Sequence, residues 1–216
     1  GIRFVLFTQG CPLRCLYCHN PDTWKKEDAK HILTPQEVFD EFYKVRNFVR
    51  GGITVSGGEP MLQPEFILEL FKICKEHNVH TTIDTSGIYL NDKVKEVLDY
   101  TDLVLLDIKH INPEKYKSLT NADLNATLRF MDYLAEIDKP VWLRYVLVPG
   151  YTDDDNDLNE WAKYASQFNN VERVDILPFH QMAIHKWEEL NKEYQLKDVK
   201  SPSSEEINKA TDIFRS

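Results

Sequence analysis

The chain has 216 residues, of which 42% are hydrophobic, enough for a globular domain with a substantial core. Its formal net charge of −9 argues against nucleic acid as a general partner, because the phosphate backbone would be repelled. The sequence contains no leader peptide, lipidation motif or membrane-length apolar run, so we expect a cytoplasmic protein without a membrane partner. Since Gly1 directly precedes a strand-like run, we also expect a natural N-terminal segment before it.

Short apolar runs alternate with helical patterns, which is typical of parallel strands joined by crossover helices. The expected strands are Ile2 to Phe7, Ile53 to Val55, Val79 to Ile83, Leu103 to Leu106, Val141 to Val148 and Val174 to Leu177. Of the helices between them, the clearest begins at Thr34-Pro35-Gln36-Glu37, a capping box with proline at the first helical position. A closed barrel needs eight such units. We therefore predict an α/β fold, a partial and open (β/α)6 barrel, forming one domain over residues 1–216.

The loop after the first strand, Gly10 to Asn20, contains three of the four cysteines. Cys11, Cys15 and Cys18 have the spacing C-x-x-x-C-x-x-C, which brings three thiolates towards one centre. A structural zinc site needs a fourth ligand, and iron-sulfur clusters are normally held by four cysteines. Either another residue completes this site, or one metal position is open to a substrate. Cys74 lies on an apolar helical stripe, so we expect it in the core.

Polar residues follow the expected strands at their carboxyl ends, where α/β barrels place their chemistry. They are Gly57, Gly58 and Glu59, then Asp84, then Asp107 and Lys109, then Arg144, and finally His180. Each could simply cap a loop when taken alone. Together they indicate a site in which Glu59 accepts from an ammonium group while Lys109 and Arg144 hold a carboxylate. The two glycines would let the backbone approach this amino-acid ligand closely.

These motifs resemble those of a known family. The cysteine motif with Tyr17 before its last cysteine, followed by Gly57-Gly58-Glu59, resembles the radical S-adenosylmethionine (SAM) superfamily. Within it, the stretches GIRFVLFTQGCPLRCLYCHNPDTW, VSGGEP, LLDIKH, VWLRYVLVPGYTDDD and LPFH resemble the activating enzymes of pyruvate formate-lyase, from Gly1 almost to the C-terminus.

The resemblance implies two cofactors, a 4Fe-4S cluster held by Cys11, Cys15 and Cys18, and S-adenosylmethionine bound to the fourth iron through its methionyl part. The implied catalytic set is these three cysteines with Lys109 and His180. The implied SAM contacts are Tyr17, Cys18, His19, Gly57, Gly58, Glu59, Asp84, Asp107, Ile108, Lys109, Arg144 and His180. Asp84 and Asp107 are also expected to hold a monovalent cation.

The implied reaction is the reductive cleavage of SAM to methionine and a 5′-deoxyadenosyl radical, which takes a hydrogen atom from a glycine Cα of pyruvate formate-lyase (formate C-acetyltransferase), an enzyme of anaerobic glucose metabolism. The implied partners are the glycine loop of that enzyme and a low-potential electron donor such as flavodoxin or ferredoxin. We expect a monomer, with His180 and the segment 181–187 contacting the partner at the barrel rim.

Two alternatives remain open. The first is an activase of another glycyl radical enzyme, such as anaerobic ribonucleotide reductase. The absence of a cysteine-rich insert between Cys18 and the second strand favours the pyruvate formate-lyase type over most such relatives. The second is a non-catalytic α/β protein with a structural Cys3His zinc site, in which His19 would be the fourth ligand.

Overall fold

The computed structural model describes residues 1–215 and is built on a six-stranded sheet in which every neighbouring pair is parallel. The strands are β1 (Phe4–Thr8), β2 (Ile53–Gly57), β3 (Thr81–Thr85), β4 (Leu103–Asp107), β5 (Val141–Leu147) and β6 (Val171–Pro178). Their order in the sheet follows the sequence, so β1 and β6 are its two edges. The predicted open (β/α)6 barrel is confirmed.

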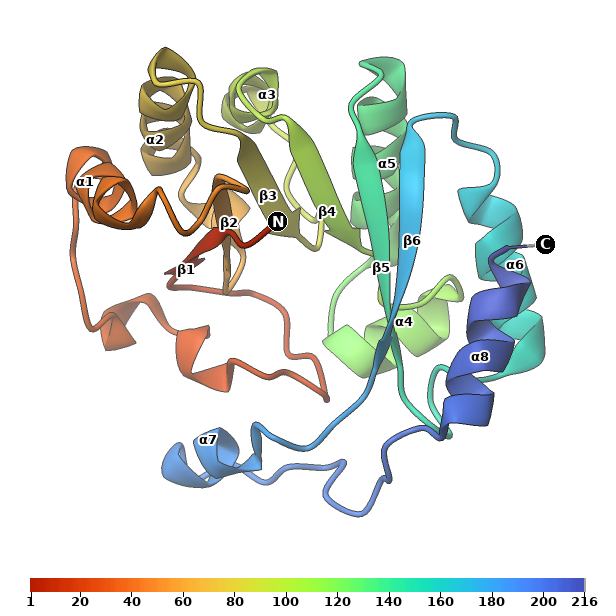
Figure 1. Ribbon diagram of the computed structural model, residues 1–216. Coiled ribbons are helices and arrows are strands. Elements are labelled where there is room, and N and C mark those ends of the chain that lie inside the picture. The colour runs from red at the N-terminus through yellow and green to blue at the C-terminus, as the bar shows by residue number, and fades with distance from the viewer. Residues whose placement is uncertain (216) are drawn as a thin grey trace.

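The helices follow the strands along the chain, and most cover the outer side of the sheet, whereas the helix Ile184–Glu189 lies beyond the carboxyl ends of the strands (Figure 1). They are α1 (Pro35–Val45), α2 (Pro64–Glu76), α3 (Asp92–Asp99), α4 (Pro113–Thr120), α5 (Leu124–Glu136), α6 (Asp155–Ala165), α7 (Ile184–Glu189) and α8 (Ser204–Ile213), with short 3-10 turns η1 (Pro21–Thr23), η2 (Lys26–Asp28) and η3 (Pro60–Leu62). The capping box at α1 is present: Thr34 Oγ1 accepts from the Glu37 N–H (3.2 Å), and the Glu37 carboxylate accepts from the Thr34 N–H (2.7 Å). No helix in residues 1–215 has both the length and the apolar character needed to cross a membrane.

The apolar side chains form two clusters with different roles. The larger lies between the sheet and the outer helices, and includes Cys74, as expected. The smaller lies at the carboxyl ends of the strands and consists of Tyr17, Leu119, Val148, Phe179, Trp187, Tyr194 and Leu196. Because it joins the cysteine loop to the segment after β6, this second cluster supports the end of the barrel where the site was predicted.

Some element boundaries differ from the prediction. The Val79 N–H is bonded to the Cys74 carbonyl at the end of α2 (2.8 Å), so β3 begins two residues later than expected, at Thr81. The strand also ends two residues later than expected, at Thr85, so Asp84 lies within β3 rather than after it. The short helices α4 and α7 were not predicted; α4 is capped by Asn112 and has proline at its first position.

Candidate active site

A cavity of about 510 Å³ lies at the carboxyl ends of the strands, a volume within the usual range for small-molecule sites. Its lining includes nearly all the predicted site residues: Cys11, Cys15, Tyr17, Cys18, His19, Gly57, Gly58, Glu59, Asp84, Asp107, Lys109, Arg144 and His180. Ile108 does not line it, because its side chain is fully buried in the larger apolar cluster. The fold therefore gathers around one cavity site residues that are spread along the sequence from Cys11 to His180.

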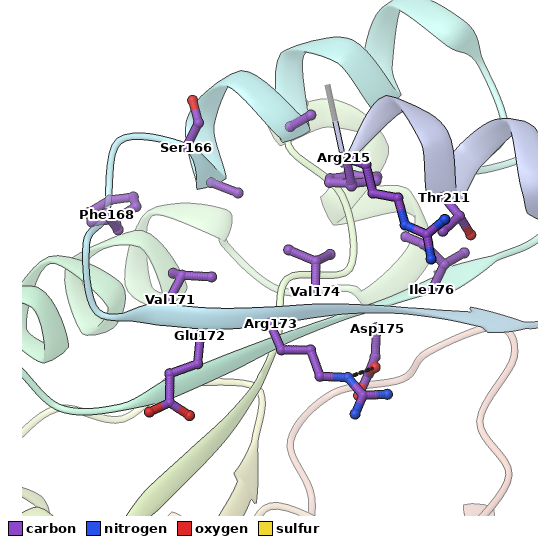
Figure 2. A pocket seen from close by; sticks show the side chains of 13 residues that line it. Ser166, Phe168, Val171, Glu172, Arg173, Val174, Asp175, Ile176, Thr211 and Arg215 are labelled. Atoms are coloured by element: carbon purple, nitrogen blue, oxygen red, sulfur yellow. Dashed lines mark hydrogen bonds and ion pairs between the residues drawn. The ribbon is translucent and has the colours of Figure 1, made fainter.

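A second hollow, of about 690 Å³, lies between α6, α8 and the edge strand β6 (Figure 2). On the helix side of β6 it presents the apolar side chains of Val174 and Ile176, whereas Arg173 and Asp175 point to the opposite face, where Arg173 Nε donates to Asp175 Oδ1 (2.5 Å). None of the predicted site residues lines this hollow. The first cavity is therefore the better candidate for a site that needs convergent polar groups.

Backbone contacts hold the cysteine loop in place although it has no regular structure. The Cys11 N–H donates to the Trp24 carbonyl (3.1 Å), and the Leu16 N–H donates to the Leu119 carbonyl at the end of α4 (3.0 Å). The carbonyl of Cys18 accepts from Nε1 of Trp187 in α7 (2.9 Å). The surroundings of the three cysteines are thus fixed by different parts of the fold.

The three thiols lie near enough to influence one another's ionisation. Burial raises the pKa of Cys11 to about 11 and that of Cys15 to about 12, and it also raises the pKa of Cys18. Repulsion from Cys18 adds to the rise at the other two, while the positive charge of Lys109 opposes it at all three. A metal must displace the protons of its thiol ligands. Lys109 therefore favours the thiolate forms that a cluster would require.

The zinc alternative does not fit this geometry. Among residues 1–215, no three histidine, cysteine or acidic side chains are grouped so that they could share one metal ion. His19, the expected fourth ligand, instead stacks on His180 with ring centroids 4.1 Å apart, and its Nε2 lies 3.2 Å from the His180 carbonyl oxygen. A cube-shaped cluster differs because each cysteine binds a separate iron. Three cysteines that line one cavity but are not grouped around a single point therefore fit a cluster better than a single ion.

The two glycines after β2 have a structural role that the sequence did not reveal. Gly57 has φ +110°, and a Cβ atom there would collide with the backbone of Thr8. A Cβ at Gly58 would collide with the carbonyl oxygen of Gly10, and the Glu59 N–H donates to that same oxygen (2.8 Å). The glycines thus let the end of β2 pack directly against the cysteine loop, whereas we had expected them to make room for a ligand.

Glu59 is 1% exposed, and both of its carboxylate oxygens are engaged by protein donors. Oε1 accepts from Thr85 Oγ1 (2.5 Å) and the Met61 N–H (3.1 Å). Oε2 accepts from the N–H (3.0 Å) and Oγ (2.5 Å) of Ser86. Burial raises the pKa of Glu59, and these hydrogen bonds oppose the rise. The side chain therefore joins the ends of β2 and β3, in place of the free ammonium acceptor that we expected.

The expected cations are paired with carboxylates in the cavity wall. Lys109 Nζ lies 2.6 Å from Asp107 Oδ2, and Arg144 lies 2.7 Å from Asp84 Oδ2, which also accepts from Ser56 Oγ (2.8 Å). Burial alone would lower the pKa of Lys109, but Asp107 and neighbouring groups hold it well above its usual value. Burial raises the pKa of Asp84 against the pull of Arg144. Both cations therefore remain charged beside the cavity.

One carboxylate oxygen in this wall has no partner. Asp107 Oδ1 is buried and accepts no hydrogen bond from residues 1–215. Buried polar atoms are normally satisfied. This oxygen is therefore suited to receive a ligand hydroxyl or a cation.

Sequence reasoning missed several residues of the site. Ser56, Thr85 and Ser86 line the cavity and hold the acidic groups, and their position at strand ends could have identified them. Trp24 also lines the cavity, and Trp187 supports it from α7. Trp187 contacts Cys18 from more than 160 positions away, so no local pattern indicates it.

Comparison with known proteins agrees with this geometry. Residues 5–162 match the Radical SAM superfamily. The chain is 45% identical to the pyruvate formate-lyase-activating enzyme of Staphylococcus aureus (strain USA300), over 97% of this chain and 87% of that protein. This chain belongs to the pyruvate formate-lyase-activating enzyme family. Within that family, a domain of the Bacteroides vulgatus enzyme has a similar crystal structure, with a TM-score of 0.65 and 25% identity over 76% of this chain and 93% of that one.

A more distant protein shares the fold. Streptococcus suis SuiB bound to S-adenosylmethionine has a TM-score of 0.75 to this chain at 15% identity, over 98% of this chain and 47% of that one. The likeness to SuiB concerns the fold alone. It shows that the open barrel of this activating-enzyme family member also occurs in a protein of low sequence identity.

Proposed function

We propose that this protein is a radical SAM oxidoreductase that activates pyruvate formate-lyase by generating a radical on a glycine residue of that enzyme. The observation that carries the proposal is the convergence of Cys11, Cys15 and Cys18 with the charged groups of four other strands on one cavity. Family membership supplies the class of reaction, and the 45% identity over nearly the whole chain supports pyruvate formate-lyase as the protein substrate.

The cofactors are a 4Fe-4S cluster and S-adenosylmethionine, and the donor set suits them. Three cysteines leave one iron of a cube without a protein ligand, and this iron is where the amino and carboxylate groups of a methionyl moiety would bind. When bound, the pair supplies one-electron cleavage of the sulfonium and hydrogen-atom abstraction, chemistry that the protein orients but does not itself perform. The protein's own residues must therefore position both cofactors and exclude water from them.

We assign roles to the cavity residues on this basis. Lys109 and Arg144 provide positive charge for a carboxylate, and each is held in position by its aspartate. Tyr17, His19 and His180 provide ring surfaces beside Cys18, in keeping with an adenine site. The expected contact at Ile108 would have to be made by its main chain, since its side chain lies in the core.

A monovalent cation site at Asp84 and Asp107 also belongs to this proposal. The two carboxylates lie on adjacent strands, where Asp84 pairs with Leu105, two residues before Asp107, and Asp107 Oδ1 is buried without a partner among residues 1–215. A cation near a carboxylate of the ligand would satisfy this oxygen. Removal of monovalent cations from the buffer should weaken S-adenosylmethionine binding without releasing iron.

The remaining expectations are proposals of the same kind. We propose one radical SAM domain over residues 1–216, a monomer, a cytoplasmic location, and a flavodoxin or ferredoxin as electron donor. The free state of all four cysteines supports a reducing compartment. In the segment 181–187, the exposed side chains that remain for the expected rim contact are Met182 (76% exposed) and His185, because Trp187 and Lys186 contact the chain after Cys15 instead.

The test is anaerobic incubation of the cluster-loaded protein with S-adenosylmethionine, a reductant and pyruvate formate-lyase, followed by electron paramagnetic resonance. We expect the doublet of a glycyl radical, and none when Cys15 is replaced by serine. A parallel sample with anaerobic ribonucleotide reductase distinguishes the alternative partner. A radical on the reductase but none on pyruvate formate-lyase would overturn the assignment.

A further inference from the structure

The segment 180–187, which follows β6 and enters α7, contacts residues 18–22, at the end of the cysteine loop and the start of η1. The His180 carbonyl lies 3.2 Å from His19 Nε2, and Trp187 Nε1 donates to the Cys18 carbonyl (2.9 Å). Lys186 Nζ donates to Asn20 Oδ1 (2.9 Å) and forms an ion pair with Asp22 (3.0 Å). In Figure 1, α7 and the loop after β1 lie at the same end of the sheet.

Trp187 is the centre of this contact. It is 6% exposed, and its ring packs edge-on against Trp24 (centroids 5.1 Å apart, 88° between planes) and obliquely against Tyr194 (5.1 Å). The indole N–H is its one donor, and it is used on the main chain of Cys18. Ring packing and hydrogen bond together fix the position of this cysteine relative to α7.

Trp24 connects this contact to the first cysteine. Its carbonyl accepts from the Cys11 N–H (3.1 Å), and its ring, which packs on Trp187, lines the same cavity as Cys18. The two tryptophans therefore support both ends of the cysteine motif, Trp24 at Cys11 and Trp187 at Cys18.

The segment 180–187 is itself anchored, so it can support the loop. Gln181 Nε2 donates to the carbonyls of Leu196 (3.1 Å), Lys197 (2.8 Å) and Val199 (2.7 Å), and the Phe179 N–H donates to Leu147 at the end of β5 (3.1 Å). Residues 18–20, in contrast, lie in no helix or strand. Apart from short-range bonds such as that from the Cys18 N–H to the Cys15 carbonyl (3.1 Å), their position depends on contacts from outside the loop.

We propose that residues 180–187 form a clamp that holds Cys18 in its cluster-binding position, with Trp187 as the positioning residue. A ligand already held in place loses less conformational freedom when it binds. The proposal rests on the role of Cys18 in the proposed function. It adds that retention of the cluster depends on a segment more than 160 residues away from the cysteine motif.

The test compares Trp187→Phe, which keeps an aromatic ring but removes the N–H, with the control Trp142→Phe, which removes an indole bond to Glu172 (3.0 Å) on β6. Lys186→Met, which removes the contacts to Asn20 and Asp22, is a second and milder variant. In metal-free protein, the alkylation rate of each cysteine is followed by mass spectrometry. In anaerobically reconstituted protein, the rate of cluster loss to an iron chelator is followed by absorbance.

One hydrogen bond contributes about 1 kcal/mol, so we expect Trp187→Phe to speed both Cys18 alkylation and cluster loss by roughly three- to tenfold. Alkylation of Cys11 and Cys15 should change little, and Lys186→Met should act in the same direction. Wild-type rates at Cys18 in both variants would overturn the clamp. If Trp187→Phe unfolds, buried Cys74 will react faster too, and Lys186→Met then decides. A wild-type protein that takes up no cluster would refute the proposed function, while the alkylation rates would still test the clamp.

Discussion

Replacement of Glu59 by glutamine tests whether this residue is a buried structural acceptor. Each of its two oxygens accepts from one backbone N–H, Met61 on Oε1 and Ser86 on Oε2. A glutamine amide can be turned either way, but its NH2 group then faces one of those N–H donors. The hydroxyls of Thr85 and Ser86 can rotate, whereas a backbone N–H cannot.

The magnitude follows from this geometry. A buried donor without an acceptor costs about 1–3 kcal/mol, and the hydrogen bonds that remain lose the assistance of the charge, which is about half their strength. Glutamine is neutral, so the substitution also removes the cost of burying a charge, which is the effect that raises the pKa of Glu59. This gain offsets part of the loss in stability. We expect Glu59→Gln to lower the free energy of unfolding by about 2–4 kcal/mol.

The assay is guanidinium unfolding of the metal-free protein at pH 7, with Glu69→Gln as a control because Glu69 is exposed on the same stretch of chain, in α2. The control should remain within about 0.5 kcal/mol of wild type. If Glu59→Gln matched the control in stability but bound S-adenosylmethionine more weakly, the reasoning would be refuted. Glu59 would then be the free ammonium acceptor that the sequence indicated.

Three further substitutions probe other parts of the molecule. Lys109→Ala should leave the iron content unchanged but weaken S-adenosylmethionine binding by about tenfold or more in equilibrium titration; lost iron with unchanged affinity would contradict the assignment. Cys74→Ala should keep a full cluster by absorbance and lose about 1 kcal/mol of stability, and a missing cluster would show that a ligand was misassigned. Burial alone would raise the pKa of Asp102, but hydrogen bonds from Lys75 and the Thr81 N–H (2.8 Å) hold it below 3.8. The charged Asp102 carboxylate therefore stabilises the fold at neutral pH, and this effect is lost as the pH falls below 3.8. In urea unfolding, Asp102→Asn should be less stable than wild type at pH 7 and approach wild type in acid. A difference in stability that did not depend on pH would exclude this linkage.

The sequence predicted the architecture and the composition of the cavity well. The carboxyl ends of the strands in a parallel sheet meet at one edge, so the strand pattern alone predicts that residues such as Asp107 and Arg144 lie close together. The registers bear this out, because these two residues are paired directly between β4 and β5. Cys74 was likewise placed correctly, since helical periodicity identifies a core face.

The role of a side chain that depends on its hydrogen-bond partners could not be predicted from the sequence in the same way. Glu59 follows a strand and carries a charge, but its partners Thr85 and Ser86 follow another strand, and only the packed structure shows that they satisfy it. The role of Gly58 was unpredictable for the same reason, because a side chain is excluded there by the carbonyl oxygen of Gly10, which belongs to another loop. Trp187 has no local signal at all.

The boundary of β3 shows a local effect overcoming a pattern. Val79 has high strand propensity, but its N–H closes the end of α2 on Cys74. The strand therefore begins at Thr81, and Asp84 becomes a residue of β3 with its side chain on the cavity. New bounds for the strand do not change which face each of its side chains occupies, because side chains alternate along the strand in either case, so the prediction of Asp84 as a cavity residue was unaffected.

The most direct test of the cofactor site is product analysis. Reduced, cluster-loaded protein is incubated with S-adenosylmethionine under strict anaerobiosis, and methionine and the nucleoside products are separated and quantified by chromatography. Three cysteines that leave one iron open to the methionyl group predict equal amounts of methionine and 5′-deoxyadenosine, both absent with Cys11→Ser. Cluster-loaded wild-type protein that forms no more 5′-deoxyadenosine than this variant would contradict the central claim.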